Sequence, residues 1–396
     1  MKYIYADHAA TTAISEEAKL EMMDCMDRFY GNPSSLHRPG QEAAEMLAEC
    51  RETVAGLMNA DPREIYFTSG GSEADNQALL TAAKVGEKKG KRHLISTAFE
   101  HHAVLHTLKR LEQEGFAVTL LPVYDDGLVR PEDVTAAIRE DTACVSVMYA
   151  NNEIGTVQPV REIGEICREK GVLFHVDAVQ AAGRLPIDVK DMKIDLLAVS
   201  AHKFNGPRGV GALYCRKGIR LVNLIEGGAQ ERGKRAGTEN LPAIAGMATA
   251  FAAAWETHKE SNEKTAAMRD RLIAGLEKIP HSKLNGDRQK RLPGIVNFCF
   301  EGIEGESLLL HLDARGIAAS SGSACTSGSL DPSHVLLALG LPHEVAHGSL
   351  RLSIGEENTP EEMDYIVKSV TEVVSYLRDM SPVWEELETG KKPHLL

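Results

Sequence analysis

The chain lacks the features that mark membrane-spanning, secreted and nucleic-acid-binding proteins. The longest apolar candidate for a bilayer span, 243–255, is short and rich in alanine, and residues 1–7 contain no apolar core of a signal peptide. Basic side chains are outnumbered by acidic ones, 44 to 57, and the net charge is −13, whereas nucleic acids and anionic membranes attract basic surfaces. We therefore expect a globular protein with neither a membrane nor a nucleic acid as a direct partner.

Cysteine spacing argues against two further classes of protein. The seven cysteines are scattered along the chain, and no two of them are spaced Cys-x-x-Cys. Disulfide frameworks and zinc sites need cysteines in regular groups. This pattern therefore predicts free thiols, no metal site and a reducing, cytoplasmic environment.

One of these cysteines, Cys325, has unusual neighbours. Its surroundings, 320–329 (SSGSACTSGS), consist almost entirely of small polar residues and glycine. Such residues bury little and resist regular structure, so we expect a loop whose thiol is mobile and exposed to water. A mobile thiol suits an enzyme that carries an atom from one place to another. The alternative is an ordinary Ser/Gly loop that contains a cysteine without a chemical role.

Length and periodicity predict an α/β protein. The 396 residues suffice for two or three domains. Up to residue 215, short apolar segments alternate with helical patterns, which is typical of a mainly parallel sheet covered by helices on both faces. The predicted strands are 64–68, 92–96, 118–122, 143–148, 172–176, 196–199 and 210–214, and the predicted helices include 73–84, 103–114, 131–139 and 160–170.

The pattern changes after residue 237, where a long helical stretch, 241–279, precedes a smaller α+β domain. The strands predicted for this domain are 295–300 and 350–354, and its helices are 306–314 and 360–377. The last helix begins with a capping box, Thr359 to Glu362, with proline at its first position. Residues 390–396 are polar, and we expect them to fray.

Lys203 and Asp177 each follow or end a predicted strand, where ligands bind in open α/β sheets. A lysine there can form a Schiff base with an aldehyde cofactor. An acidic side chain there can pair with a pyridinium nitrogen and keep it protonated. The structural alternatives are a solvated surface lysine for Lys203 and a helix cap for Asp177.

The turn after strand 64–68 has the composition of an anion site. It contains paired glycines and a hydroxyl immediately before a helix (TSGGSEAD), and the free amides of a helix start bind phosphate. Many strand–helix turns share this composition. A phosphate site, a strand-end aspartate and a strand-end lysine on one sheet are more specific together, and they predict pyridoxal phosphate (PLP).

Three further positions are candidates for the same site. His101 could stack on a flat cofactor ring and exchange protons near neutral pH, although His102 competes with it and either could simply start a helix. The amide of Asn151 or Asn152 could bind a ring substituent or a substrate carboxylate, or could form a turn. Arg351 could grip a substrate carboxylate or form a partly buried salt bridge.

These motifs occur in the order found in a known family. The matching segments are the phosphate turn, 7–12 (DHAATT), 31–35 (GNPSS), 100–101 (EH), 151–155 (NNEIG), 175–180 (HVDAVQ), 200–203 (SAHK) and 321–327 (SGSACTS). From end to end, the chain resembles the cysteine desulfurases of the NifS/IscS class. Its long Ser/Gly loop is similar to that of the NifS/IscS subgroup and unlike the shorter loop of the SufS-like subgroup.

The resemblance implies a PLP-dependent transferase of fold type I that works as a homodimer. A large PLP-binding domain would span 16–260. A small domain, 261–396, would carry the cysteine loop and pack with an amino-terminal segment, 1–15. Two positions depart from the family: His8 stands where Asn is usual, and Ser72 stands where Thr is common but keeps the hydroxyl.

Residue roles follow from the same resemblance, by motif position. Around the cofactor ring, the implied roles are the Schiff-base lysine for Lys203, the pyridinium partner for Asp177, ring stacking for His101 and a bond to the phenolic oxygen for Gln180. Around the phosphate, the implied residues are Gly71, Ser72, Ser200 and His202, with Thr238 reaching the phosphate of the neighbouring subunit. The substrate carboxylate would be bound by Asn152 and Arg351.

The implied reaction converts L-cysteine to L-alanine. The thiolate of Cys325 would attack the substrate sulfur, hold it as a persulfide and pass it to an acceptor, such as an iron–sulfur scaffold or a tRNA-thiolation protein. One alternative is another PLP reaction on the same fold, such as that of an aminotransferase or a selenocysteine lyase. A second is a non-catalytic sulfur carrier or scaffold partner, against which Lys203, Asp177 and Cys325 all argue.

Overall fold

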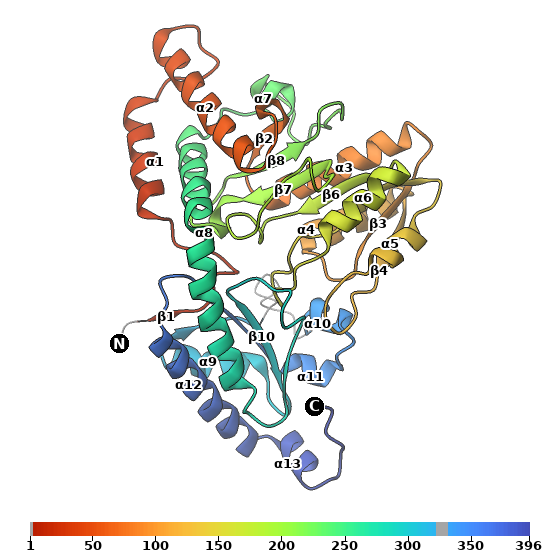
Figure 1. Cartoon of the computed structure of the whole chain (residues 1–396), viewed down its shortest axis with the longest axis vertical. Coiled ribbons are helices and arrows are strands. Elements are labelled where there is room, and N and C mark those ends of the chain that lie inside the picture. The colour runs from red at the N-terminus through yellow and green to blue at the C-terminus, as the bar shows by residue number, and fades with distance from the viewer. Residues whose placement is uncertain (1–2, 322–331) are drawn as a thin grey trace.

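The computed structural model describes residues 3–321 and 332–396, which form two lobes joined by one long helix (Figure 1). The larger lobe is built around a seven-stranded sheet in the order β2-β8-β7-β6-β5-β3-β4. Its strands are β2 (Ile65–Thr68), β3 (His93–Thr97), β4 (Ala117–Leu121), β5 (Thr142–Ser146), β6 (Leu173–Asp177), β7 (Leu196–Ser200) and β8 (Gly211–Cys215). Each of them lies within two residues of a strand predicted from the sequence.

The sheet is parallel except at β8, which runs antiparallel to both of its neighbours, β2 and β7. Only residues 201–210 connect β7 to β8. A parallel connection needs a dozen or more residues, usually a helix, so this short link makes β8 reverse direction. The predicted mainly parallel α/β sheet is therefore confirmed, with one reversed strand.

Helices cover both faces of the sheet, which is why its strands are apolar on both sides. α3 (Gly71–Glu87) packs across β5, β7 and β8 beside α4 (His102–Gln113), in a core that includes Leu196 and Ala198. The alternate residues of β7, Leu197 and Val199, enter the core on the other face. The helices of that face are α2 (Arg38–Leu57), α5 (Pro131–Ala137), α6 (Val160–Lys170) and the first half of α8 (Leu241–Leu276).

The smaller lobe has its own core and an antiparallel sheet in the order β12-β10-β9. Its elements are β9 (Ser282–Leu284), β10 (Ile295–Phe300), α9 (Gly305–Asp313), β12 (Ser349–Ser353) and α12 (Pro360–Asp379). The amino-terminal strand β1 (Ile4–Tyr5) pairs with β11 (Ile317–Ala318), and Ile4 shares the small-lobe core. Thr359 and Glu362 form the predicted capping box at the start of α12.

α8 is one continuous helix of 36 residues that runs from the large lobe into the small one (Figure 1). The domain limit expected at residue 260 falls inside this helix, and the division into 16–260 and 261–396 stays a prediction. No helix in the described part of the chain is both long and apolar enough to cross a bilayer. The remaining helices are α1 (Glu16–Arg28), η1 (Pro62–Glu64), η2 (Ala201–Lys203), α7 (Gln230–Gly233), α10 (His334–Ala338), α11 (His343–His347) and α13 (Pro382–Glu388).

The end of the chain is held against the small lobe, so the expectation of a frayed tail is wrong there. Both oxygens of the buried Glu301 carboxylate are used: Oε2 pairs with His394 Nδ1 at 2.9 Å, and Oε1 accepts the Leu395 N–H at 2.7 Å. The rings of His394 and His281 stack with centroids 3.7 Å apart and planes only 16° apart. Nearly parallel rings cannot both direct a lone pair at one ion, so we assign this cluster a structural role.

Candidate active site

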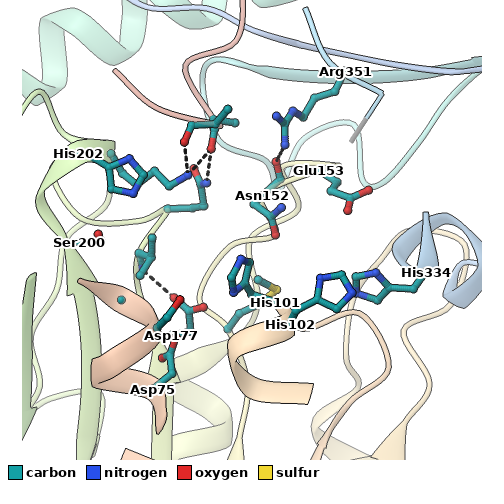
Figure 2. Close-up of a pocket in the computed structure, with 18 residues that line it drawn as sticks. Asp75, His101, His102, Asn152, Glu153, Asp177, Ser200, His202, His334 and Arg351 are labelled. Carbon is teal, nitrogen blue, oxygen red and sulfur yellow. Dashed lines mark hydrogen bonds between the residues drawn. The ribbon is translucent and has the colours of Figure 1, made fainter. Parts of the chain in front are cut away.

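A cavity of about 300 Å³ lies at the carboxyl ends of the central strands, where the small lobe meets the sheet (Figure 2). Its lining combines residues from both lobes and from the amino-terminal segment. The lining residues are Ala9, Ala10, Gly71, Ser72, Asp75, His101, His102, Met148, Asn152, Glu153, Asp177, Val179, Gln180, Ser200, His202, Lys203, His334 and Arg351. Ten of the positions expected from the sequence therefore meet in one place.

Lys203 reaches the cavity from η2, directly after β7. Its Nζ donates hydrogen bonds to the carbonyl oxygens of Ala9 at 2.5 Å and Ala10 at 2.8 Å. The side chain is half-buried, unlike the solvated surface lysine that was the structural alternative. Its amine is thus held at the cavity wall by the amino-terminal segment.

Asp177 is the last residue of β6 and is 5% exposed. Its Oδ1 accepts the backbone N–H of Val179 at 2.9 Å, so the capping role also exists. Burial raises the pKa of this carboxyl to about 6, while the Val179 N–H and the charge of Lys203 oppose the shift. A buried carboxylate at this depth is suited to a positively charged partner.

The start of α3 gives one end of the cavity the features of an anion site. Its N-cap residue, Gly70, offers no side-chain cap, so the first amides of the helix are available to a ligand. An adjoining hollow is lined by Ser72, Ser200, His202 and Arg208. A Cβ built on Gly71 would come within 2.7 Å of Val179 Cγ2, so glycine is needed for this close approach.

His101 is the N-cap of α4 and also lines the cavity. Its Nδ1 accepts the Ala103 N–H at 3.1 Å, so the proton of the neutral ring lies on Nε2. Burial, and then the charge of Lys203, lowers its pKa to about 4. His101 is therefore a neutral hydrogen-bond donor in this structure, and the expected proton exchange stays a prediction.

Arg351 enters the cavity from β12 of the small lobe and is 2% exposed. Its Nη2 pairs with Asp7 Oδ1 at 2.9 Å, and its Nη1 donates to the carbonyl of Asn152 at 3.1 Å. The expected salt bridge is therefore present alongside the cavity position. Asn152 lines the cavity, whereas Asn151 uses Oδ1 to accept the N–H groups of Glu153 and Ile154, as in a turn.

Sequence reasoning missed the part played by the amino-terminal segment. The Ala9 carbonyl accepts from Gln180 Nε2 at 2.9 Å as well as from Lys203, and the Thr12 N–H donates to the His202 carbonyl at 3.0 Å. Backbone carbonyls leave no side-chain signature in a sequence, so composition could not identify them. The segment 7–12 therefore forms one wall of the site.

Asp75, Glu153 and His334 were also not predicted as lining residues. Asp75 carried a recognisable signal, because it lies one helical turn after Gly71 and so faces the same side of α3. His334 gave none: its Nε2 binds the Glu100 carbonyl at 2.9 Å, and its ring lies 4.6 Å from that of His102, contacts that only the fold creates.

Two expected site residues are absent from this lining. Thr238 is exposed at the surface and does not line the cavity of its own chain. Cys325 lies outside the described residues. The six described cysteines are all free and buried, and burial raises the pKa of each thiol.

The arrangement of charged groups fits PLP. The amine at the cavity wall matches an aldehyde, and the buried carboxylate at the floor matches a pyridine nitrogen. The uncapped helix start, with hydroxyls and a guanidinium nearby, matches a phosphate. The glycine at the helix start lets the helix pack closely against Val179 at that end of the cavity. Fold and cavity together define a PLP-dependent enzyme of fold type I.

Comparison with known proteins agrees with this class. The profile of the aminotransferase class-V family matches residues 4–366. The chain is 54% identical over 394 residues to "Cysteine desulfurase IscS" of Clostridium botulinum (strain Hall), covering 99% of both chains, and 52% identical to "Cysteine desulfurase IscS" of Methanosarcina thermophila, covering 96% of this chain and 94% of the relative. A solved "NifS-like protein" is 39% identical with a TM-score of 0.89 and covers 95% of this chain and 100% of that one.

The chain therefore belongs to the aminotransferase class-V family and, within it, to the PLP-dependent cysteine desulfurases of the NifS/IscS group. The family, fold class and cofactor expected from the sequence motifs are confirmed.

Proposed function

We propose that this chain converts L-cysteine to L-alanine with PLP in the cavity, and that Cys325 takes the sulfur as a persulfide. The observation that carries the proposal is the single cavity that contains Lys203, Asp177 and the start of α3 together with Arg351 of the small lobe. Membership of the family supports it, because relatives of this length and identity bear the name cysteine desulfurase.

Each end of the cavity would hold a different part of the cofactor. Lys203 would bond to the aldehyde carbon, Asp177 would face the ring nitrogen, and the start of α3 with Ser72, Ser200 and His202 would bind the phosphate. His101 and Gln180 would contact the ring. When bound, PLP supplies an electron sink next to the α-carbon of an amino acid.

The substrate carboxylate would bind at Arg351 and Asn152, on the small-lobe side of the cavity. Arg351 already pairs with Asp7, so a substrate carboxylate has to share its guanidinium. The Nε–H of Arg351 is buried and makes no hydrogen bond within the described residues, which leaves a donor for that purpose.

Lys203 and His101 would have different roles at the reacting atoms. Lys203 would remove the α-proton of the substrate. His101 already accepts a hydrogen bond at Nδ1 and carries its proton on Nε2, so in its neutral form it would donate a hydrogen bond to a bound group and would not take up a proton through Nδ1. The thiol of Cys325 must lose its own proton to another base or to water.

Cys325 is the candidate nucleophile because only a thiolate is nucleophilic and the described cysteines are unsuited. All six of these are buried with raised pKa values. As the sulfur of Cys325 bonds to the substrate sulfur, the substrate C–S bond breaks and its electron pair stays on carbon. Protonation of that carbon, and the return of a proton to the α-carbon from Lys203, complete L-alanine.

The sulfur acceptor and the second subunit are part of the same proposal. A sulfur-acceptor protein, such as an iron–sulfur scaffold or a tRNA-thiolation protein, would receive the persulfide sulfur in the cytoplasm. A second copy of this chain would complete the site, because Thr238 is exposed and away from its own cavity. Several large apolar side chains in and after α1 are exposed, which supports a homodimer.

The test is product analysis of the purified holoenzyme with L-cysteine and a reductant. Alanine and sulfide in equal amounts support the proposal. Pyruvate and ammonia with sulfide would indicate a lyase, and a requirement for a keto acid would indicate an aminotransferase. Selenocysteine tested beside cysteine distinguishes a selenocysteine lyase. A protein that binds no PLP would favour a non-catalytic sulfur carrier.

Cys325→Ala should keep the yellow bound cofactor and lose sulfur transfer, because no other thiol of the described chain is both exposed and easily ionised. We expect alanine formation to fall by at least about a hundredfold. Radiolabelled cysteine followed by non-reducing gel electrophoresis measures the bound sulfur. Cys25→Ala, at a buried thiol, is the matched control, and full activity of Cys325→Ala would refute the assignment.

Lys203→Ala should bind PLP without a covalent bond. Reduction with borohydride followed by mass spectrometry should add the cofactor mass to the Lys203 peptide of the wild type and to no peptide of the variant. Lys190→Ala, at an exposed lysine, should behave as the wild type does. The cofactor mass on a different lysine of the wild type would contradict the assignment.

A further inference from the structure

A pair of buried ionisable side chains lies beside Asp177 and has no role in the mechanism above. Asp75 and His175 have side chains that are 2% and 0% exposed, and Asp75 Oδ1 lies 3.4 Å from His175 Nε2. Neither of these two atoms makes a hydrogen bond within the described residues. Asp75 also lines the cavity, beside Asp177 in Figure 2. Such unpaired buried polar atoms are rare and need an explanation.

The two-residue repeat of β6 and the helical repeat of α3 bring these groups together. His175 and Asp177 are two residues apart on β6 and therefore point to the same face of the sheet. α3 packs on that strand, and Asp75 lies one turn after Gly71 on the cavity side of the helix. The helix start that binds an anion thus also delivers a carboxyl group to the floor of the cavity.

The surroundings of Asp75 and His175 determine which of the two can carry a charge. His175 Nδ1 lies 2.8 Å from Ser146 Oγ, so the histidine has a fixed partner on its far side. Burial lowers the pKa of His175 to about 3. Burial, and then the charges of Asp177 and Glu100, raises the pKa of Asp75 well above its usual range. Both effects favour a protonated Asp75 beside a neutral His175.

We propose that Asp75 is a positioning residue that stays protonated beside His175, so that the negative charge at this end of the cavity is confined to Asp177. Two carboxylates at one buried site do not both ionise, and a charged Asp75 would drive the proton onto Asp177. A protonated Asp177 could no longer stabilise a charged ring nitrogen. This inference rests on the proposed function only in taking Asp177 as the partner of the cofactor ring.

The first test measures the proton itself, by infrared spectroscopy of the PLP-bound protein at neutral pH without L-cysteine. The difference spectrum between wild type and Asp75→Asn should contain the C=O stretch of a protonated carboxyl, shifted in heavy water. Glu100→Gln provides a reference band, because burial raises the pKa of Glu100 to about 8. A difference spectrum with only carboxylate bands would overturn the proposal.

The second test measures the consequence for the cofactor. Asparagine resembles a protonated aspartate in shape and charge, so Asp75→Asn should bind PLP within about threefold of the wild-type Kd and keep the pH dependence of its absorption spectrum. Asp177→Asn should shift that pH dependence, because it removes the charge. Loss of PLP binding by a folded Asp75→Asn protein would mean that Asp75 is ionised and paired with a charged His175.

A third variant distinguishes the two holders of the proton. In His175→Asn the protonated-carboxyl band of Asp75 should persist if Asp75 already holds the proton in the wild type. A band that is absent from the wild type and appears only in His175→Asn would show that the proton belongs to the histidine. Circular dichroism confirms that each variant is folded. None of these measurements depends on alanine formation, so a protein that binds PLP but fails to desulfurate cysteine would refute the proposed function and leave this inference open to its own test.

Discussion

Several side chains that line the cavity also make a hydrogen bond or ion pair that stabilises the fold. Asp177 caps a turn through the Val179 N–H, His101 caps α4, and Arg351 pairs with Asp7. A carboxylate, an imidazole and a guanidinium each have more than one donor or acceptor, so one can serve the backbone while another faces the cavity. The structural and functional interpretations of these residues are therefore compatible.

His8, the residue that departs from the family, is explained by its contacts. Its Nδ1 lies 2.9 Å from the Ser353 carbonyl and its Nε2 lies 2.6 Å from Glu357 Oε1. Both contacts are therefore with oxygen atoms, one at each ring nitrogen. His8 thereby ties the amino-terminal segment, which holds Lys203, to β12 and to the loop that precedes α12.

Loss of this bond should destabilise the protein in a pH-dependent way. His8 lowers the pKa of Glu357 to about 2, from about 4.3 in an unfolded chain. A lowered carboxyl pKa contributes stability above pH ~4.3 that is lost as pH falls toward about 2. His8→Asn should therefore lower the free energy of unfolding more at pH 6 than at pH 3. The difference should be less than about 1 kcal/mol, because Glu357 is 54% exposed and screened.

Differential scanning fluorimetry between pH 3 and pH 6 measures this difference. Glu357→Gln should cause the same loss of stability at pH 6. In the Glu357→Gln background, His8→Asn should have almost no further effect on stability. An equal loss at both pH values would show that packing, and not the ion pair, accounts for the effect.

At the scale of elements, the start of α3 links the phosphate end to β6. Gly70 has a φ of 147°, which favours glycine, and Gly71 leaves no room for a side chain against Val179. The helix start therefore packs against Val179, whose N–H donates to Asp177, so adjacent backbone places the start of α3 and Asp177 in the cavity.

Gly71→Ala should weaken PLP binding by about tenfold or more, because overpacking costs about 1–3 kcal/mol and valine is stiff at χ1. Adding Val179→Ala should restore much of the affinity by removing the clash. Gly56→Ala in α2 is a matched control, because its added Cβ would meet nothing within 4 Å. Absorbance titration with PLP measures the affinities, and an unaffected Gly71→Ala protein would contradict the close approach.

At the scale of the whole molecule, α8 and the amino-terminal segment both join the two lobes. The segment starts in the small-lobe core at Ile4, passes Arg351 at Asp7 and ends on the large lobe at Thr12. Arg351 and Lys203, which both line the cavity, thus come from different lobes. Any motion between the lobes would change the distance between Arg351 and Lys203.

Association of two chains should depend on apolar side chains in and after α1. Tyr30 is 77% exposed and Leu36 is 91% exposed, near the exposed Leu20 and Met23 of α1. The double variant Tyr30→Glu with Leu36→Glu should shift a dimer to monomers in sedimentation velocity and weaken PLP retention. Leu310→Glu, at a 73% exposed site on α9, should leave the dimer intact. An unchanged dimer would place the interface elsewhere.

The sequence by itself determined the class of fold, the approximate strands and most polar residues of the cavity. Alternating apolar segments impose a covered parallel sheet, and strand-end residues of such a sheet converge at one edge. Lys203, Asp177 and the glycine turn could therefore be identified without coordinates.

Tertiary structure alone decided the rest. Long-range packing creates three of the contacts described above. The Ala9 and Ala10 carbonyls bind Lys203, β8 pairs antiparallel with β7, and the Glu301 carboxylate binds the end of the chain. Backbone groups carry no residue-specific signal, and a pair such as Asp75 and His175 acquires its shared chemistry only when a helix is laid on a strand. Local pattern predicts which face a side chain takes, and only the fold determines what it meets there.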